Sequence, residues 1–260
     1  MKHQEIIAAI EEVAPLVWQE PYDNAGWQVG NPDGEAKAAL LCIDVTESVI
    51  DEAIRRGCNL IICHHPLIFG GLKNVTPQDA TGRCVIQAVK NDMAIYAAHT
   101  NLDNVSEGVN AKIAEKIGLQ NGRILQPKTI DGQIGAGWIG TLPQAETEES
   151  FLARLKNIFH LQMIRYTPLL NKKIKTVALC GGAGSFLLGD AIAQKADVFL
   201  SGDFKYHDFF KAENRILTVD TGHFELEQYT KEIFFDIIRK KFPTFALYFS
   251  ETKTNPINYF

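Results

Sequence analysis

The sequence lacks the features that mark secreted, membrane-spanning and nucleic-acid-binding proteins. Its five cysteines include no Cys-x-x-Cys pair, which argues against a disulfide framework or a zinc-cysteine module. No apolar run is long enough to cross a bilayer, and Met1 to Glu5 lack the apolar core of a secretory signal. The 26 basic residues are outnumbered by 31 acidic ones, for a formal net charge of -5, so nucleic-acid binding is not expected. These absences favour a cytoplasmic protein with neither membrane nor nucleic-acid partners.

The remaining composition is that of an ordinary globular protein. Hydrophobic residues make up 46% of the chain and charged residues 22%, and 260 residues suffice for one large or two medium domains. Cys42, Cys63 and Cys180 lie in or beside apolar runs, so we expect them as reduced core residues.

Strand and helix patterns alternate in both halves of the chain. Strands are predicted over 27–29, 39–43, 60–63, 94–98, 134–142, 175–180, 198–200, 216–219 and 244–249. Helices are predicted over 3–14, 47–56, 78–91, 108–117, 147–159, 186–195 and 225–241. This alternation is typical of βαβ units with mainly parallel or mixed sheets. We predict an α/β fold of two domains, 1–125 and 126–260, related by divergent duplication, with the boundary at 126–132.

The stretch from Asn59 to Pro66 has the most distinctive chemistry. Four apolar residues predict a strand buried on both faces, and the strand must end near Pro66, which cannot donate to a sheet ladder. His64 and His65 follow the strand directly, where adjacent side chains can address one site from two directions. Metal ligation is the favoured role, since imidazole is the side-chain group that most commonly binds metals in proteins. The alternative is one hydrogen-bonded core histidine and one loop histidine.

Further donors follow later strands. Asp103 follows a strand that ends at His99; it is a candidate ligand or a residue that binds loop amides, and His99 is interpreted as structural or as support for a ligand. His223 and Glu227 are four residues apart at the start of a helix, so both side chains lie on one helical face. Glu227 is otherwise a solvated helix residue, and Glu225 points away from that face.

Three imidazoles and two carboxylates exceed what one catalytic zinc ion takes, which is usually three protein ligands. The set fits two divalent ions that share a carboxylate. Zn, Fe, Mn, Co and Ni are all compatible with nitrogen and oxygen donors.

Other polar motifs have weaker signals. Asp203 and His207 are candidate proton shuttles or supports for ligands, or else belong to a capped helix start. The glycine-rich stretch 181–185 could bind a phosphate through its amides, but it lacks the P-loop pattern and is interpreted as a tight turn. His3 and His160 are interpreted as surface residues.

Several motifs together resemble those of one family. They are Tyr22 to Gly26, Leu60 to Pro66, His99 to Asp103, Ser201 to His207 and Gly222 to Glu227. Their order and content are similar to those of the NGG1-interacting-factor-three-like family, whose bacterial members are called GTP cyclohydrolase I type 2 homologues. The resemblance covers essentially the whole chain. The sequence departs from the family in three ways. Leu226 stands where a small polar residue is common, and Tyr22 stands where tryptophan is common. Some members carry an inserted domain in mid-chain, for which this chain has no room between Gly118 and Lys175.

The resemblance implies two interlocked α/β domains, a dinuclear metal site and a ring-shaped homohexamer. The implied ligands are His64, His65, Asp103, His223 and Glu227. The expected function is a dinuclear metal-dependent hydrolase, in which a metal-bound water attacks a nucleotide-like or phosphorylated small molecule, with Asp203 or His207 moving protons. The alternative is a non-catalytic metal-binding scaffold or a regulatory interaction protein.

Overall fold

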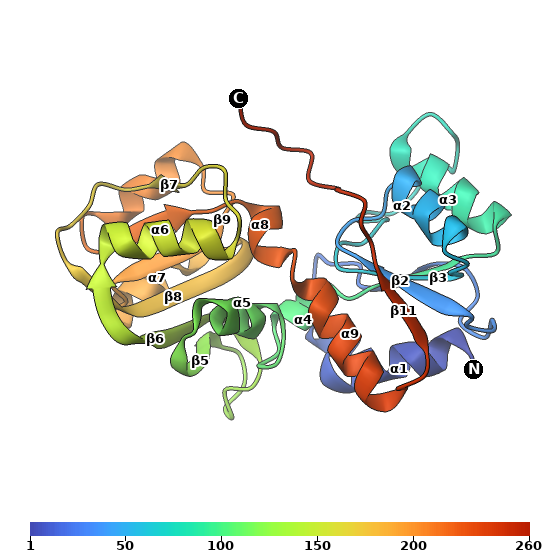
Figure 1. Cartoon of the computed structure of the whole chain (residues 1–260), viewed down its shortest axis with the longest axis horizontal. Coiled ribbons are helices and arrows are strands. Elements are labelled where there is room, and N and C mark those ends of the chain that lie inside the picture. Colours follow the sequence, from blue (N-terminus) through green and yellow to red (C-terminus); the bar gives the residue numbers. More distant parts are fainter. The chain divides into compact units, whose positions relative to one another are not determined.

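The computed structural model describes all residues, 1–260, and confirms the predicted mixed α/β class. The chain divides into two compact units. The first comprises Met1–Leu102 and Thr230–Pro256, and the second comprises Asp103–Tyr229 and Ile257–Phe260. Each unit contains its own sheet (Figure 1).

This division differs from the contiguous domains 1–125 and 126–260 predicted from the sequence. The last strand, β11 (Ala246–Phe249), pairs in parallel with β2 (Ala38–Cys42), which returns the C-terminal segment to the first unit. The helix α5 (Val109–Ile117) packs on strands of the second sheet. Pairing between segments distant in sequence therefore sets the boundary, and local composition carries no signal for it.

The first unit is a five-stranded sheet between two layers of helices. Across the sheet the strands are β1 (Gly26–Val29), β4 (Ala94–Ala97), β3 (Leu60–Cys63), β2 and β11. β1 is antiparallel to β4, and all other pairs are parallel. Helices α2 (Glu47–Arg55) and α3 (Ala80–Lys90) cover one face, and α1 (His3–Val13) and α9 (Thr230–Lys241) cover the other (Figure 1). The short η1 (Leu16–Trp18) follows α1, and α4 (Thr100–Asp103) follows β4.

Successive side chains of each strand point to opposite faces of the sheet, so the core has one half under α2 and α3 and another under α1 and α9. Leu40, Ile61 and Ile95 belong to the buried cluster beneath α2 and α3. Tyr96 points to the opposite face, where its hydroxyl donates to Glu11 of α1 at 2.8 Å. His3 is also buried, at 3% exposure, so its interpretation as a surface residue is wrong: its Nδ1 lies 2.9 Å from the Asn31 carbonyl oxygen.

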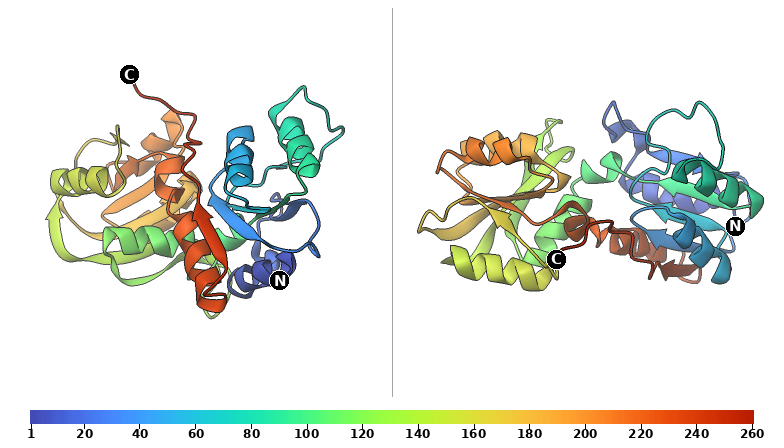
Figure 2. Two further views of the ribbon diagram at one scale, coloured as in Figure 1. Left: turned by 45° about the vertical axis from the view of Figure 1, so that its right-hand side comes forward. Right: turned by 90° about the horizontal axis from the view of Figure 1, so that it is seen from above.

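The second unit is a six-stranded mixed sheet. In spatial order its strands are β5 (Gln120–Pro127), β6 (Gly135–Thr147), β8 (Lys173–Ala183), β9 (Val198–Gly202), β10 (Leu217–Asp220) and β7 (Arg165–Tyr166). β8, β9 and β10 are parallel, and the outer pairs are antiparallel. Helices α5 and α6 (Glu148–Ile158) cover one face; α7 (Leu188–Ala193), η2 (Ser185–Leu187) and η3 (Tyr206–Ala212) lie on the other (Figure 2).

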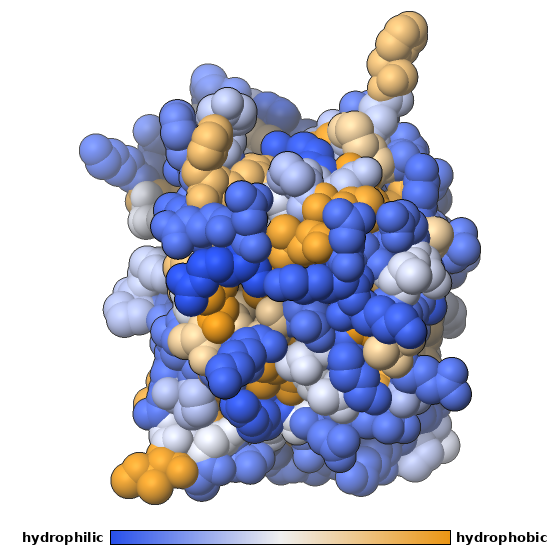
Figure 3. Space-filling view, turned by 90° about the vertical axis from the view of Figure 1, so that its left-hand side faces the viewer, coloured by the Kyte–Doolittle hydropathy of each residue, from blue (hydrophilic) through white to orange (hydrophobic).

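The core beneath α7 contains Ala178, Leu187, Ala191, Phe199 and Phe204. The outer surface of this unit is mostly hydrophilic, with apolar side chains in separate patches (Figure 3).

The helix predicted over 225–241 is two helices, α8 (His223–Glu227) and α9. Residues on either side of the break are anchored in different units. The Tyr229 hydroxyl donates to the Ile158 carbonyl in the second unit at 2.9 Å, whereas Phe234 is fully buried in α9 of the first. The apolar periodicity continues through the break, so the sequence pattern does not reveal it. No helix of the chain is both long and apolar enough to cross a membrane.

In both sheets, parallel strands bring polar residues to one edge. β2, β3 and β4 are followed by Asp44, His64 and His99, and in the other unit β9 and β10 are followed by Asp203 and His223. Carboxyl ends of parallel strands share one edge of a sheet, where functional groups collect.

Candidate metal centre

His64 and His65 form the centre of the donor cluster in the first unit. Both backbone amides donate to the Ile43 carbonyl, at 3.1 and 2.9 Å, which fixes the chain where it leaves β3. His64 is fully buried, and its Nδ1 lies 2.9 Å from the Ala98 carbonyl oxygen. Because a carbonyl can only accept, Nδ1 carries the proton and Nε2 carries the lone pair.

His65 is oriented by a carboxylate. Its Nδ1 lies 2.6 Å from Asp44 Oδ1. Burial opposes ionisation of Asp44, but hydrogen bonds from His65 and Thr254 outweigh it and lower the pKa of this carboxyl group. The ionised carboxylate favours the tautomer of His65 that carries its proton on Nδ1 and its lone pair on Nε2. Asp44 and His65 also line a cavity of about 220 Å³, which has Cys84 in its wall.

His99 joins this cluster. One ring nitrogen from each of His64, His65 and His99 lies within 4.8 Å of the others. His99 Nδ1 is 2.8 Å from Asp23 Oδ1. Burial opposes ionisation of Asp23, yet hydrogen bonds from His99 and Thr100 lower its pKa to about 2. His99, interpreted from the sequence as structural or as support for a ligand, thus has its ring next to those of the two candidate ligands.

In the second unit, His223 lies between two carboxylates. Its Nδ1 is 2.8 Å from Asp203 Oδ2, and its Nε2 is 3.0 Å from Glu227 Oε2. The predicted four-residue spacing on one helical face is confirmed. Glu227 is 3% exposed, so the alternative of a solvated helix residue is wrong.

Glycines leave space for these two side chains. Gly182 has φ +59°, and a Cβ there would lie 2.4 Å from Glu227 Oε1 and 3.2 Å from the His223 ring. Of the stretch 181–185, predicted as a tight turn, residues 181–183 are instead the end of β8, which has an irregular register against β9 between Leu179 and Ala183, and Gly184 and Ser185 lead into η2. Only a residue without a side chain fits this backbone. The glycines therefore form the wall of the site.

Asp103 completes the donor set of the second unit. One of its carboxylate oxygens lies within 4.8 Å of one from Glu227. Its carbonyl accepts from Asn110 Nδ2 at 3.0 Å, while Asn110 Oδ1 accepts from the Gly181 amide at 2.9 Å. Burial and the charges of Asp103 and Glu227 raise the pKa of the Cys180 thiol. Cys180 is therefore a protonated core residue, as predicted, and all five cysteines are buried and free.

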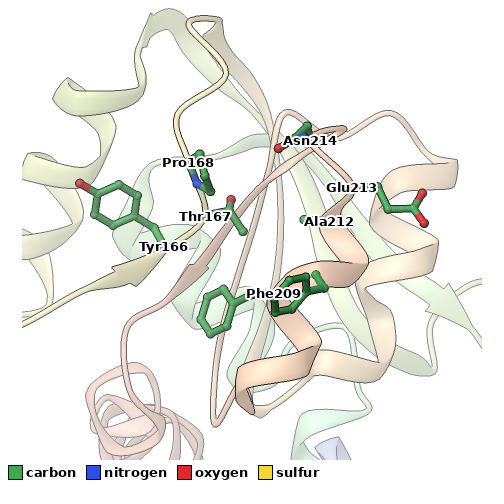
Figure 4. Close-up of a pocket in the computed structure, with 8 residues that line it drawn as sticks. Tyr166, Thr167, Pro168, Phe209, Ala212, Glu213 and Asn214 are labelled. Carbon is green, nitrogen blue, oxygen red and sulfur yellow. The ribbon is translucent and has the colours of Figure 1, made fainter.

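The two predicted proton shuttles have different contacts. Asp203 contacts His223, whereas His207 is an exposed residue of η3 whose ring packs against Tyr206 and Phe210. The same helix contributes Phe209 and Phe210 to a cavity of about 350 Å³, closed on the other side by the segment after β7 (Figure 4). Its walls are mostly apolar, and they offer no imidazole or thiol for a metal.

Comparison with known proteins places the whole chain in one group. Residues 1–256 match the family model described as Duf34/NIF3 (NGG1p interacting factor 3). The chain belongs to the Duf34/NIF3 family. The resemblance inferred from the sequence motifs is thus confirmed.

Two Duf34/NIF3 relatives carry the name GTP cyclohydrolase 1 type 2 homolog. The protein of Clostridium perfringens is 36% identical over 230 residues, covering 87% of each chain. That of Lactococcus lactis is 33% identical over 267 residues, covering 98% of each. The crystal structure of a Bacillus cereus protein related to NIF3 superposes with a TM-score of 0.92 at 25% identity, covering 100% of this chain and 99% of that one.

Sequence reasoning on this Duf34/NIF3 chain missed the residues that orient the donors. Asp44 and Asp23 each bind a histidine Nδ1 but lie 21 and 76 positions away in the sequence. The available signal for Asp44 was its place directly after a buried strand, parallel to the strand before His64. Gly182 was noticed, but its positive φ was not expected.

Proposed function

We propose that this chain is a dinuclear divalent-metal-dependent hydrolase acting on a nucleotide-like or phosphorylated small molecule. The proposed ligands are His64, His65, Asp103, His223 and Glu227. Zn, Fe, Mn, Co and Ni all suit nitrogen and oxygen donors. When bound, such ions bring the pKa of coordinated water toward neutrality and polarise a phosphoryl or carbonyl oxygen.

The observation that carries the proposal is the contact between His223 and Glu227. With its Nδ1 proton directed at Asp203, a neutral His223 presents a lone pair at Nε2, 3.0 Å from a buried carboxylate oxygen. Two acceptors at this separation repel each other unless a positive species is shared between them. A second proton on the imidazole or a metal cation meets this need. The neighbouring Asp103 carboxylate adds a further negative charge and favours a divalent cation.

The first unit supports the same chemistry independently. His64 and His65 both have Nδ1 engaged by an oxygen acceptor, which leaves Nε2 as the nitrogen that can ligate. Neutral imidazoles with one nitrogen held in this way are typical of histidines that bind metals.

Within this proposal Asp203 is the better candidate for moving protons. It already contacts a proposed ligand, and its side chain is 51% exposed, so it can exchange protons with water while it orients His223. The role of His207 stays a prediction from the sequence motif.

The test combines metal analysis with turnover. Metal-free protein would be loaded with each of the five ions and supplied with GTP and a panel of nucleotides and phosphate esters, with release of formate or phosphate as the readout. Glu227→Gln should lower metal affinity at least about tenfold and abolish turnover. Glu225→Gln changes a neighbouring carboxylate on α8 and should retain both metal affinity and turnover.

Three outcomes would count against the proposal. Full turnover by Glu227→Gln after metal loss would contradict the mechanism. Equal metal affinity in both variants would contradict the ligand set. Stoichiometric metal without turnover of any substrate would favour a metal-binding scaffold. The hexamer stays a prediction, and light scattering of the purified protein tests it.

A further inference from the structure

Asp44 links the C-terminal segment to His65. We propose that this segment positions the metal-ligating nitrogen of His65, with Thr254 acting through the Asp44 carboxylate. The inference rests on the proposed function, since it assigns a support to one of the proposed ligands. Thr254 and Asp44 are positioning residues in this scheme.

Both oxygens of Asp44 are used. Oδ1 accepts from His65 Nδ1 at 2.6 Å, and Oδ2 accepts from Thr254 Oγ1 at 2.6 Å. One carboxylate thus joins residues that are 189 positions apart in the chain, the difference between their separations of 210 and 21 from Asp44. Rotation of the Asp44 carboxylate would break one bond or the other, so Thr254 restricts the direction in which His65 is held.

The segment that carries Thr254 is itself firmly anchored. The Ser250 amide continues the pairing of β11 with β2 by donating to the Leu41 carbonyl at 2.9 Å. Beyond it, the buried carboxylate of Glu52 accepts from the Ser250 hydroxyl, the amides of Glu251 and Thr252 and the Thr252 hydroxyl, at 2.7 to 3.1 Å. The backbone that leads to Thr254 is therefore held in place, and this positions the Thr254 hydroxyl.

His64 shows why this dependence is specific to His65. The Nδ1 of His64 is held by the Ala98 carbonyl, a backbone group directly after β4, just as His64 lies directly after the neighbouring β3. The Nδ1 of His65 is held instead by the Asp44 side chain, whose orientation depends in turn on the Thr254 hydroxyl. A change confined to the C-terminal segment should therefore alter one ligand of the pair and leave the other in place.

The experiment uses four variants of the full-length chain. Thr254→Val removes the hydroxyl with little change of shape, and Thr254→Ser restores it. Thr252→Val removes a hydroxyl from the same segment that binds Glu52 instead of Asp44. Asp44→Asn removes the charge that holds His65. The readouts are Co²⁺ and Zn²⁺ affinity by competition with a chromophoric chelator, and the imidazole ¹⁵N shifts of His64 and His65 in metal-free protein.

We expect Asp44→Asn to lower metal affinity about 10- to 100-fold, the range for residues that orient ligands, and Thr254→Val to lower it about 3- to 10-fold. Both should shift the His65 nitrogens and spare those of His64. Thr254→Ser should match wild type. Thr252→Val should reduce thermal stability while keeping metal affinity within about twofold.

Wild-type affinity and unchanged His65 shifts in Thr254→Val would overturn the inference. His65→Ala separates this failure from that of the proposed function. If His65→Ala loses metal and Thr254→Val does not, only the positioning role is wrong. If wild-type protein binds neither ion, or if His65→Ala binds both as tightly as wild type, the ligand set is wrong and the positioning role with it.

Discussion

His65 in the first unit and His223 in the second are both held through Nδ1 by a carboxylate, at 2.6 and 2.8 Å. The surroundings of the two carboxylates differ. The Asp44 side chain is 32% exposed and receives a second hydrogen bond from Thr254, whereas the Asp203 side chain is 51% exposed. Asp203 also adopts φ +56°, an uncommon backbone conformation for a residue with a side chain.

This difference shows two ways of orienting a histidine side chain. The first unit fixes its histidine through a relay of side chains that begins at the C-terminal segment. The second unit holds His223 through Asp203 and also through backbone shape, because a Cβ at Gly182 would collide with the His223 and Glu227 side chains. Substitutions should therefore act by different means in the two units.

The largest effect should come from Gly182→Ala. The positive φ alone costs about 1–2 kcal/mol, and the new Cβ must also displace the buried Glu227 carboxylate, for a total of about 3 kcal/mol. Metal affinity should fall as well. Gly132→Ala is the matched control, because Gly132 has φ +69° and open space around its Cβ position. Gly132→Ala should lose only the roughly 1–2 kcal/mol of unfolding free energy that comes from the positive φ, and it should leave metal binding intact. Equal losses in denaturant unfolding would contradict the role of Gly182.

The next effect concerns the anchor of the C-terminal segment. Burial opposes ionisation of Glu52, but hydrogen bonds from residues 250–252 lower its pKa from 4.5 to about 2. Since the folded-state pKa is depressed, Glu52 contributes stability that is present above pH 4.5 and lost as pH falls toward 2.

Glu52→Gln should therefore lose less stability than wild type between pH 6 and pH 3, by about 2 kcal/mol. Urea unfolding of both proteins at the two pH values measures this difference. Parallel losses in the two proteins would show that Glu52 is not the titrating anchor.

The smallest effect compares the two orienting carboxylates directly. In metal-free protein, Asp44→Asn should reduce the free energy of unfolding by about 1–2 kcal/mol, because it weakens two hydrogen bonds to a charged group. Asp203→Asn should cost less than about 1 kcal/mol, since an exposed pair is worth little and asparagine tolerates positive φ. A larger loss for Asp203→Asn in chemical denaturation would reverse the contrast between the units.

Much of this architecture was accessible from the sequence. Apolar runs identified β2, β3 and β4, and the candidate donors were found as polar residues after buried strands, directly for His64 and His65 and a few positions further on for Asp103 and His223. His64 with His65, and His223 with Glu227, could be paired because their separations in the chain are short and their geometry is local. The break between α8 and α9 and the pairing of β11 with β2 could not be predicted, since both depend on partners distant in the sequence: Tyr229 beside the break bonds to Ile158, 71 residues away, and β11 pairs Ala246 with Ala38.

Residue identity and local spacing are enough to specify the chemistry of the donors, their order along the chain and the family to which the chain belongs. The tautomer of each histidine, and the carboxylates that hydrogen-bond to the Nδ1 atoms of His65 and His223, depend on the tertiary structure. A tautomer is set by the acceptor opposite Nδ1, and for His64, His65 and His223 that acceptor comes from another strand end, brought close by the parallel sheets.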